Sequence, residues 1–270
     1  MLKQLTAEEA QTRLKEIRDR YNQESSINNF SALIQGLPGS GKTSLAATGR
    51  LPVLVDSFDP LNTLVLRDEV KKGSVVVRAF WNESSKNPTE YNRWEKMWDK
   101  DILNGFIGMF GTYVIDSTST WIDCLTWEYC RRKGRANNMP EIQDYPILYN
   151  LIKDHIKISA TQGADFMLTA HLIAYQDEVS GRTYSEIDTY KKLKSRIPLL
   201  FTEKYVMTAK EVPKAKENHS GIKHILLTSA AGRYNASTQL GKGGIFDAEE
   251  EPNIKALLKK AGLSTEDKKI

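Results

Sequence analysis

The segment at residues 36–43 reads GLPGSGKT and constrains the fold more than any other part of the chain. It fits the spacing G-x-x-x-x-G-K-[ST] at every fixed position, with an apolar run before it and a helix-forming run after it. Such a loop lets backbone N–H groups wrap around phosphate oxygens, and the following helix points its positive end at them. A strand, a glycine-rich loop and a helix in this order indicate a βα unit of a parallel sheet.

Each position of the loop has an expected role. Lys42 should reach the β and γ oxygens of a nucleoside triphosphate, and the hydroxyl of Thr43 should bind Mg²⁺. The residues that we assign to the nucleotide are Gly36, Pro38, Gly39, Ser40, Gly41, Lys42, Thr43 and Ser44.

A second metal ligand is expected at the end of another buried strand. The run TYVIDS at 112–117 places four strand formers before Asp116. We therefore expect Thr43 and Asp116 to form the metal site, and ATP and Mg²⁺ to be the cofactors.

Alternating apolar runs and turn residues predict the remaining elements. Strands are expected at 31–35, 52–55, 74–80, 112–115, 166–170, 201–209, 223–228 and 233–236, the last two forming a hairpin that turns at 231–232. Helices are expected at 42–48, from 87–88 onward, and at 120–132, 146–160 and 253–261. The stripe of Trp94, Trp98, Ile102 and Phe106 is typical of a core-facing helix.

The first thirty residues predict an appended helix. Thr6 and Glu9 have the spacing of a capping box, and Leu14, Ile17 and Tyr21 fall on one helical face. We divide the chain into an N-terminal helix and linker (1–29, the linker from 22), a nucleotide-binding domain (30–262) and a C-terminal tail (263–270).

Composition excludes several classes of protein. The 270 residues are 40% hydrophobic with a net charge of +4, as in an ordinary globular chain. No apolar run reaches the ~18 residues of a membrane span, and the first residues show no secretion signal. Cys124 and Cys130 are too few for a disulfide framework. We expect a cytoplasmic protein with reduced thiols and no membrane partner.

The residues around Asp116 exclude several classes of phosphate-loop protein. Ser117 replaces the glutamate found in many helicases and AAA+ proteins, and strands rather than a helical lid follow His171. The chain lacks Asn-Lys-x-Asp and a glycine three residues after Asp116, which argues against a GTPase. It also lacks Leu-Ser-Gly-Gly-Gln, which argues against a transporter ATPase.

Four segments resemble the RecA-like ATPase core: GLPGSGKTS, TYVIDSTST, FMLTAH and GRYNAST. The resemblance covers roughly residues 31–262 and fits best the small phage-type RecA-like ATPases, which include Sak-type single-strand-annealing recombination proteins. It implies an α/β P-loop NTPase core: a mostly parallel sheet flanked by helices, with a C-terminal β-hairpin and an appended N-terminal helix. It also implies ATP hydrolysis coupled to single-stranded DNA, in the host cytoplasm if the chain is phage-encoded.

The resemblance assigns catalytic residues. Lys42 and Asp116 keep their roles, and His171 ends the strand at which RecA-like proteins place a polar sensor of the γ-phosphate. The catalytic glutamate of RecA is matched here by Phe58, so the chain departs from the pattern. Asp59, or less favourably Asp56, could orient the attacking water instead. If neither acid reaches the site, the protein would act as a slow nucleotide switch.

The resemblance also places DNA-binding loops after Asp116 and after His171. The two loops are rich in cations, and the second also carries Tyr175, Tyr184 and Tyr190, which suits phosphates and stacked bases. The assigned cations are Arg131, Arg132, Lys133, Arg135, Arg182, Lys191, Lys192 and Lys194. A solvated charged face remains the alternative for each cluster.

RecA-like sites are completed by a neighbouring subunit, which implies a homo-oligomer. Arg196 and Lys204 are the candidates for the cation given to the γ-phosphate of the neighbour. The N-terminal helix is either an oligomer contact or a cap on the sheet.

Two other functions remain open. One is a nucleotide-gated binding module, such as a helicase loader or assembly factor, which the missing glutamate favours. The other is a small-molecule kinase, with the region 131–139 as its lid.

Overall fold

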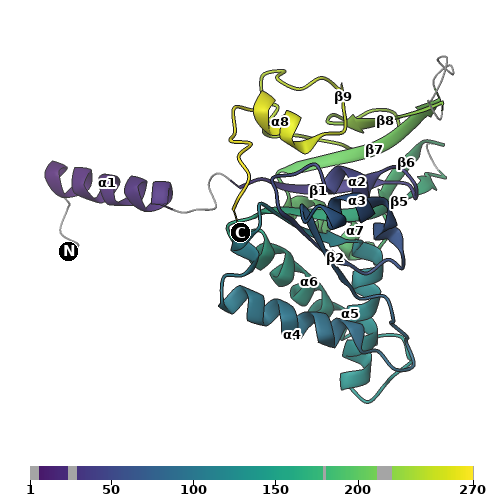
Figure 1. Cartoon of the computed structure of the whole chain (residues 1–270). Helices are drawn as coiled ribbons and strands as arrows, with labels where there is room; N and C mark the ends of the chain where they lie inside the picture. Colours follow the sequence, from purple (N-terminus) through teal and green to yellow (C-terminus); the bar gives the residue numbers. More distant parts are fainter. Residues whose placement is uncertain (1–5, 24–28, 179–180, 212–220, 270) are drawn as a thin grey trace.

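The computed structural model describes residues 6–23, 29–178, 181–211 and 221–269. Within these ranges the strands form one nine-stranded sheet with the order β3-β2-β4-β5-β1-β7-β8-β9, and β6 pairs with β5 (Figure 1). The strands are β1 (Ser31–Gly36), β2 (Val53–Ser57), β3 (Val75–Ala79), β4 (Thr112–Asp116), β5 (Asp165–Gln176), β6 (Thr183–Ile187), β7 (Glu203–Glu211), β8 (Ile222–Leu227) and β9 (Glu249–Glu250).

The sheet is mostly parallel. Strands β3, β2, β4, β5, β1 and β7 run parallel to one another, and the pairs β5–β6, β7–β8 and β8–β9 are antiparallel. The carboxyl ends of β1, β2, β4 and β5 therefore meet at one edge, where ligands bind in open α/β sheets.

Helices cover both faces of the sheet. The helices of the described residues, including α1, which projects away from the sheet, are α1 (Ala7–Gln23), α2 (Lys42–Ala46), η2 (Asn62–Leu66), α3 (Arg67–Lys71), α4 (Glu90–Leu103), η3 (Ile107–Met109), α5 (Thr118–Arg132), α6 (Tyr145–Ser159), α7 (Lys191–Arg196), η4 (Pro198–Leu200) and α8 (Ile254–Lys260). One hydrophobic core joins α4, α5 and α6 to the sheet, and a second joins α2 and α8 to the other face.

The alternation of side chains along each strand builds the two cores. In β1, Leu33 belongs to the core under α4–α6, whereas Ala32 and Ile34 belong to the core under α2 and α8. In β4, Tyr113 and Val114 divide in the same way. Strands buried on both faces read as continuous apolar runs, which is why the sequence predicts them well.

Three expectations about the elements are wrong. The strand expected at 233–236 is absent from the described residues, where Ala231 and Tyr234 instead form a tight turn with an isolated bridge. The C-terminal hairpin is made by β7 and β8. Phe106 lies beyond the end of α4, whereas Trp94 and Trp98 are buried as expected.

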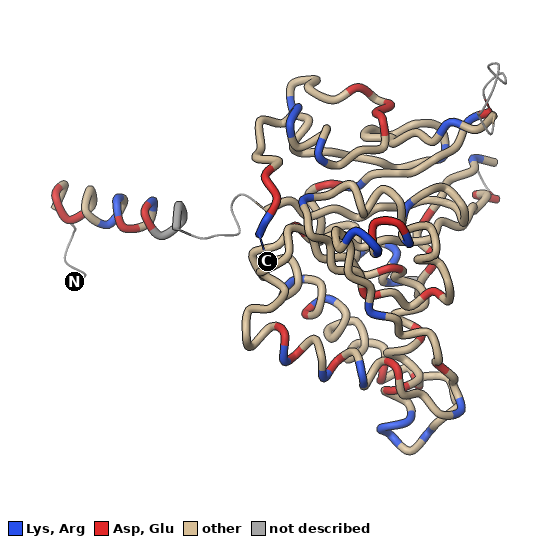
Figure 2. Tube along the Cα trace, viewed as in Figure 1, with Lys and Arg blue, Asp and Glu red and all other residues tan. Residues whose placement is uncertain are grey.

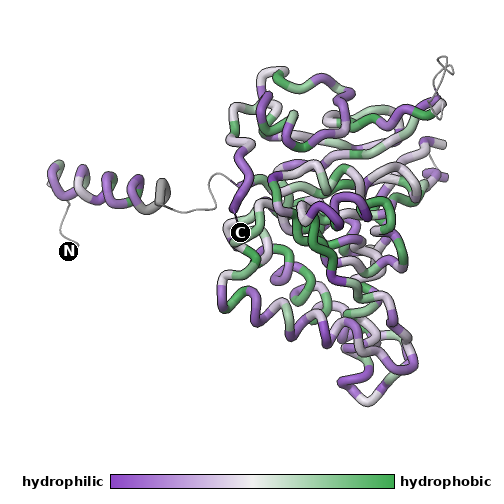
Figure 3. Tube along the Cα trace, viewed as in Figure 1, coloured by the Kyte–Doolittle hydropathy of each residue, from purple (hydrophilic) through white to green (hydrophobic). Residues whose placement is uncertain are grey.

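The N-terminal helix carries the expected capping box. The backbone N–H of Thr6 donates to the Glu9 carboxylate at 2.8 Å, and the backbone N–H of Glu9 donates to the Thr6 hydroxyl at 3.2 Å. Helix α1 projects away from the sheet and is mostly hydrophilic (Figures 1 and 3), and Leu14 and Ile17 are exposed. The side chain of Tyr21 and most of the linker expected at 22–29 lie outside the described residues.

The segment after α8 packs back onto the body. The Arg50 side chain donates to the backbone oxygen of Ser264 at 2.9 Å, and the Asp267 carboxylate accepts from the backbone N–H of Leu51 at 2.6 Å. No helix in the described part of the chain is long and apolar enough to cross a bilayer.

Candidate nucleotide site

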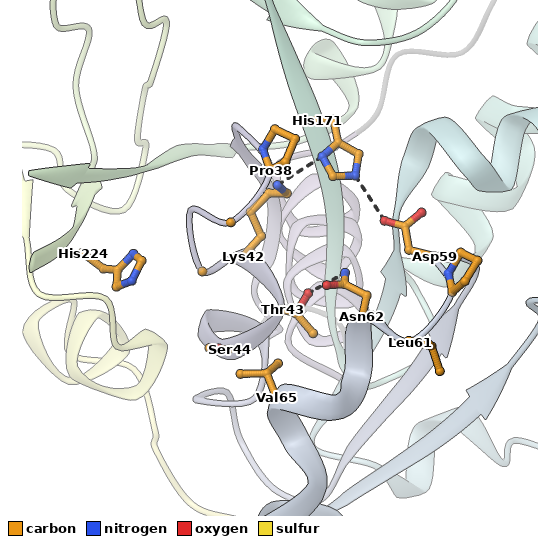
Figure 4. A pocket seen from close by; sticks show the side chains of 13 residues that line it. Pro38, Lys42, Thr43, Ser44, Asp59, Leu61, Asn62, Val65, His171 and His224 are labelled. Carbon is orange, nitrogen blue, oxygen red and sulfur yellow. Dashed lines mark hydrogen bonds and ion pairs between the residues drawn. The ribbon is translucent and has the colours of Figure 1, made fainter. Parts of the chain in front are cut away.

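A pocket of about 500 Å³ lies at the carboxyl edge of the sheet. The loop after β1, the segment after β2, one residue in the middle of β5 and one residue of β8 line it. Its lining residues are Pro38, Gly39, Gly41, Lys42, Thr43, Ser44, Asp59, Pro60, Leu61, Asn62, Val65, His171 and His224 (Figure 4). The pocket thus brings together the phosphate loop, Asp59 and His171, as the sequence predicts.

The loop backbone requires its glycines. A Cβ at Gly36 would lie 2.4 Å from the Ser40 Oγ and 2.7 Å from the backbone oxygen of Met207. Gly39 and Gly41 have φ values of 75° and 94°, which favour glycine. Among the described residues the buried Ser40 Oγ has no hydrogen-bond partner. An unpartnered buried hydroxyl in this loop fits a bound phosphate.

Lys42 is buried at the base of the loop. Its Nζ donates to the backbone oxygens of Gly36 at 3.0 Å and Leu37 at 3.1 Å. Burial lowers the pKa of Lys42, against the opposing charges of Asp116 and Asp59. Two backbone carbonyls of its own loop thus hold the ammonium in place.

Thr43 and Asp116, the residues expected to bind Mg²⁺, lie next to each other. The Thr43 hydroxyl donates to the Asp116 Oδ2 at 2.8 Å, and the Thr169 hydroxyl of β5 donates to the Asp116 Oδ1. Burial raises the pKa of Asp116, although the hydroxyls of Thr169 and Thr43 oppose that shift. A hydroxyl and a carboxylate beside a phosphate loop fit Mg²⁺, which takes few protein oxygens and keeps several waters.

Asn62 contacts both of these residues and was not predicted. Its Nδ2 donates to the Thr43 Oγ1 at 3.0 Å and to the Asp116 Oδ2 at 3.1 Å. Asn62 begins η2, and Figure 4 shows its side chain pointing at Thr43. The sequence offers only a weak signal for it, a polar residue shortly after a buried strand.

Asp59 follows the end of β2 and His171 lies within β5, and their side chains meet in the pocket. The Asp59 Oδ2 lies 3.1 Å from the His171 Nε2, and the Lys42 Nζ lies 3.4 Å from the His171 Nδ1 (Figure 4). The Asp59 Oδ1 accepts from the hydroxyls of Thr120 and, at 3.1 Å, Ser117. Burial alone would raise the pKa of Asp59, but the hydrogen bonds from His171, Thr120 and Ser117 outweigh it, and the pKa is lowered.

Phe58 points into the core rather than into the pocket. It is 1% exposed, and its ring centroid lies 5.2 Å from that of Phe80 and 5.9 Å from that of Trp94. Residue 58 therefore contributes no polar group to the pocket.

The alternative base, Asp56, has a structural role. Arg78 donates to both of its carboxylate oxygens, at 2.5 and 2.7 Å, and Trp94 and Tyr113 each donate to its Oδ2 at 2.7 Å. With these donors on a buried side chain that does not line the pocket, Asp56 is excluded as the residue that orients water.

The arginines of the first predicted DNA loop have acidic partners. Arg131 and Arg132 both bind the buried Glu128, and Arg132 also pairs with Glu95. They lie at the end of α5, which runs from the pocket edge to the far tip of the molecule (Figures 1 and 2). The helix expected at 120–132 is therefore present, and it occupies the place where the resemblance puts the first DNA-binding loop.

The other two cations of that cluster are also engaged. Arg135 donates to Asp144 at 2.7 Å and pairs with Glu141 at 3.1 Å, and the Lys133 Nζ lies 5.7 Å from the centroid of the Tyr129 ring. Carboxylates thus offset much of the positive charge of this cluster.

The second predicted loop contains a β-hairpin. Strand β5 continues past His171 to Gln176 and pairs with β6. The rings of Tyr175 and Tyr184 stack with centroids 6.0 Å apart, and the Lys194 Nζ lies 3.9 Å from the centroid of the Tyr175 ring. Arg182 lies just before β6 and Lys192 is exposed on α7, while the side chain of Lys191 is outside the described residues.

Arg196 and Lys204, the two cations expected to reach the γ-phosphate of a neighbouring subunit, lie apart from the pocket of their own chain. Arg196 is exposed at the end of α7, and Lys204 is half-buried in β7, where its backbone pairs with that of Ser237. Neither is among the side chains that line the pocket of their own chain.

His224 is a further unpredicted residue of the site. From β8 its Nδ1 lies 2.9 Å from the backbone oxygen of Ser40 (Figure 4). Only the pairing of β8 with β7 brings it there, and no local sequence signal shows that register.

The mostly parallel sheet, flanked by helices and with the phosphate loop after β1, matches a RecA-like core. The structure is similar to that of a KaiC-like protein from the hyperthermophilic archaeon Pyrococcus horikoshii OT3. The two sequences are 14% identical, the TM-score is 0.39, and the match covers 73% of this chain and 77% of that chain. No protein-family model and no curated protein matches the chain.

Proposed function

We propose that the protein binds and hydrolyses ATP with Mg²⁺ and couples this reaction to single-stranded DNA. The observation that carries the proposal is the meeting of Lys42, Asp59 and His171 in the pocket that Thr43 also lines. The buried Asp116 lies directly behind this pocket, where it accepts a hydrogen bond from Thr43. Lys42 binds the β and γ oxygens, and the glycine-rich loop surrounds the phosphates. Thr43 and Asp116 hold Mg²⁺, which neutralises charge on the phosphoryl oxygens.

Asp59 is our candidate for the residue that orients the attacking water. Its lowered pKa keeps the carboxylate ionised at neutral pH, so it accepts a hydrogen bond and is a weak proton acceptor. In phosphoryl transfer, positioning and charge stabilisation contribute most of the catalysis, so a weak base is sufficient. His171 bonds to Asp59 and lies next to Lys42, which suits a sensor of the γ-phosphate.

The continuity of β5 supports the link to DNA. His171 and Tyr175 lie on the same strand, four residues apart, so one element joins the nucleotide pocket to the β5–β6 hairpin. Stacked tyrosines beside lysines suit the bases and phosphates of a single strand. A role in phage recombination or annealing, and a homo-oligomer in which Arg196 or Lys204 completes the neighbouring site, belong to the same proposal.

A second candidate is a nucleotide-gated binding module with little hydrolysis. The burial of Phe58 favours it, because the position of the RecA glutamate carries no acid. The ion pairs of Arg131, Arg132 and Arg135 favour it too, since they reduce the charge available to DNA.

Steady-state ATP hydrolysis with and without single-stranded DNA tests the proposal, with Lys42→Ala as the blank. Several-fold stimulation by DNA supports a DNA-coupled ATPase. A slow rate that DNA leaves unchanged favours the binding module. A rate for Lys42→Ala equal to that of the unaltered protein would contradict the site itself.

A further inference from the structure

The side-chain amide of Asn62 lies where a metal ion is expected. Its Nδ2 is 3.0 Å from the Thr43 Oγ1 and 3.1 Å from the Asp116 Oδ2, and those two oxygens are 2.8 Å apart. Three polar atoms thus form a closed triangle at the base of the pocket. In Figure 4 the amide reaches this point from the opposite side to the phosphate loop.

The chemistry of the triangle fixes which end of the amide faces inward. The Asp116 carboxylate only accepts hydrogen bonds, so the nitrogen of Asn62, and not its oxygen, is the atom that it attracts. Thr169 donates to the Oδ1 of this buried carboxylate, and Thr43 and Asn62 both donate to its Oδ2. Asn62 is therefore the one of these three donors that comes from outside the phosphate loop and the adjacent strand.

A metal ion and this amide compete for the same lone pairs. Mg²⁺ requires near-octahedral oxygen ligands at about 2.0–2.1 Å, with its remaining positions filled by water or phosphate. The oxygens of Thr43 and Asp116 cannot accept from the N–H groups of Asn62 and serve a cation at the same place.

We propose that Asn62 occupies the metal position in the nucleotide-free protein and withdraws when the magnesium–nucleotide complex binds. Asn62 thereby sets the Mg²⁺ concentration at which the nucleotide is held. This inference rests on the proposed function, because it concerns the same nucleotide pocket.

The surroundings of Asn62 allow this withdrawal. Its neighbours Leu61, Leu64 and Val65 are 60%, 63% and 55% exposed, so the surface side of η2 is not packed against another element among the described residues. Thr63 and Leu66 are buried and anchor the other side of the helix. The Asn62 side chain can therefore turn away while the backbone of η2 stays in place.

Binding of a fluorescent ADP analogue over a series of Mg²⁺ concentrations tests the inference without any turnover. For Asn62→Ala we expect the half-saturating Mg²⁺ concentration to fall about tenfold, because two hydrogen bonds no longer have to be broken. Affinity for the analogue in EDTA should stay within about twofold, since no metal is then involved. Leu64→Ala is the matched control in the same helix and should behave as the unaltered protein.

Asn62→Asp provides a second variant of nearly the same shape. Its carboxylate offers an oxygen to the metal instead of a donor to Asp116, so half-saturation should also fall. An unchanged or higher value in both variants would overturn the inference, and a higher value would make Asn62 a ligand of the loaded site. Should the unaltered protein bind no nucleotide with Mg²⁺, the proposed function fails as well. Nucleotide binding with unaltered Mg²⁺ dependence in the variants overturns the inference alone.

Discussion

His171 and Asp59 share a hydrogen bond at the pocket, with the His171 Nε2 3.1 Å from the Asp59 Oδ2. The two residues lie 112 positions apart in the chain, with Asp59 just beyond the end of β2 and His171 in the middle of β5. The bond links the candidate γ-phosphate sensor to the candidate water-orienting acid, so loss of one partner should change the other.

Removing the ammonium of Lys42 should abolish nucleotide binding. For Lys42→Ala we expect an at least ~100-fold loss of ATP affinity, because charge-assisted hydrogen bonds to phosphate are lost. Isothermal titration calorimetry measures this directly. Lys72→Ala, which alters an exposed lysine after α3, serves as the control, and equal losses in the two variants would contradict the site.

The pH dependence of hydrolysis should report on Asp59. Its lowered pKa places the acid limb of kcat below the ordinary range of an aspartate, since the carboxylate stays ionised as pH falls. Thr120→Val removes one hydrogen bond to Asp59, so the acid limb should move up by about one pH unit. Ser119→Ala, at the adjacent residue, is the control and should leave the acid limb of kcat unchanged. If the acid limb of Thr120→Val is unchanged or lies at lower pH, Asp59 is excluded as the group that titrates in it.

The salt dependence of DNA binding should separate the two basic clusters. Each lost phosphate contact lowers the slope of log affinity against log salt by about one. Lys192 is exposed, whereas Lys194 pairs with Glu186 at 3.5 Å. Replacing both by Gln should therefore lower the slope by about one to two. The triple variant of Arg131, Arg132 and Arg135 should lower it less, since these side chains already bind carboxylates.

A larger decrease of the slope in the arginine triple variant than in the lysine double variant would indicate that DNA binds at the end of α5. Fluorescence anisotropy with a labelled oligonucleotide at several salt concentrations gives both slopes. Loss of DNA stimulation in Tyr175→Ala, with the DNA-free rate unchanged, would add independent support for the hairpin.

Placing a glutamate at position 58, as in RecA, should not produce a folded and faster enzyme. The Phe58 ring packs against Phe80 and Trp94 in the core, so Phe58→Glu would bury a charge and unfold the domain. Phe58→Ala should cost about 3–5 kcal/mol of unfolding free energy, and Phe58→Leu clearly less. Urea unfolding measures these costs, and a folded, faster Phe58→Glu variant would contradict the observed direction of this side chain.

Asp123 should make stability depend on pH. Burial, together with the charge of Asp188, raises its pKa to about 6. The folded state then binds more protons than the unfolded state between about pH 4 and pH 6, so stability falls as pH rises through that window. Asp123→Asn removes this cost and should gain on the order of 1 kcal/mol above pH 6, after allowance for solvent screening.

Thermal unfolding at pH 4 and pH 8 measures the effect of Asp123→Asn. The gain should be present at pH 8 and small at pH 4. The exposed Asp154→Asn on α6 serves as the control and should change stability by less than about 0.5 kcal/mol at either pH.

The sequence predicted the parts of the site that depend on local pattern. The phosphate loop, Asp116 and His171 each stand at the end of a continuous apolar strand, and strand ends in a parallel sheet meet at one edge. Asp59 was found for the same reason. Asn62, Thr169 and His224 were missed because their positions depend on which strands lie side by side.

Antiparallel pairing explains the other differences. The chain after His171 alternates polar and apolar residues weakly, so its continuation as a hairpin depends on β6 as a partner. The strand expected at 233–236 is replaced by a tight turn, because β8 pairs with β7 and β9 instead. The arginines expected to bind DNA at the end of α5 form ion pairs instead. Their partners Glu95, Glu128 and Asp144 come within reach only in the folded chain.

Strand β5 has a kinetic consequence. It runs twelve residues without a break, and its pairing passes from β1 to β6 between His171 and Leu172. With no loop between the pocket and the hairpin, the strand contains no hinge that could delay one end relative to the other. A reporter dye at Tyr184 and a nucleotide signal at the pocket should therefore relax with a single shared rate constant.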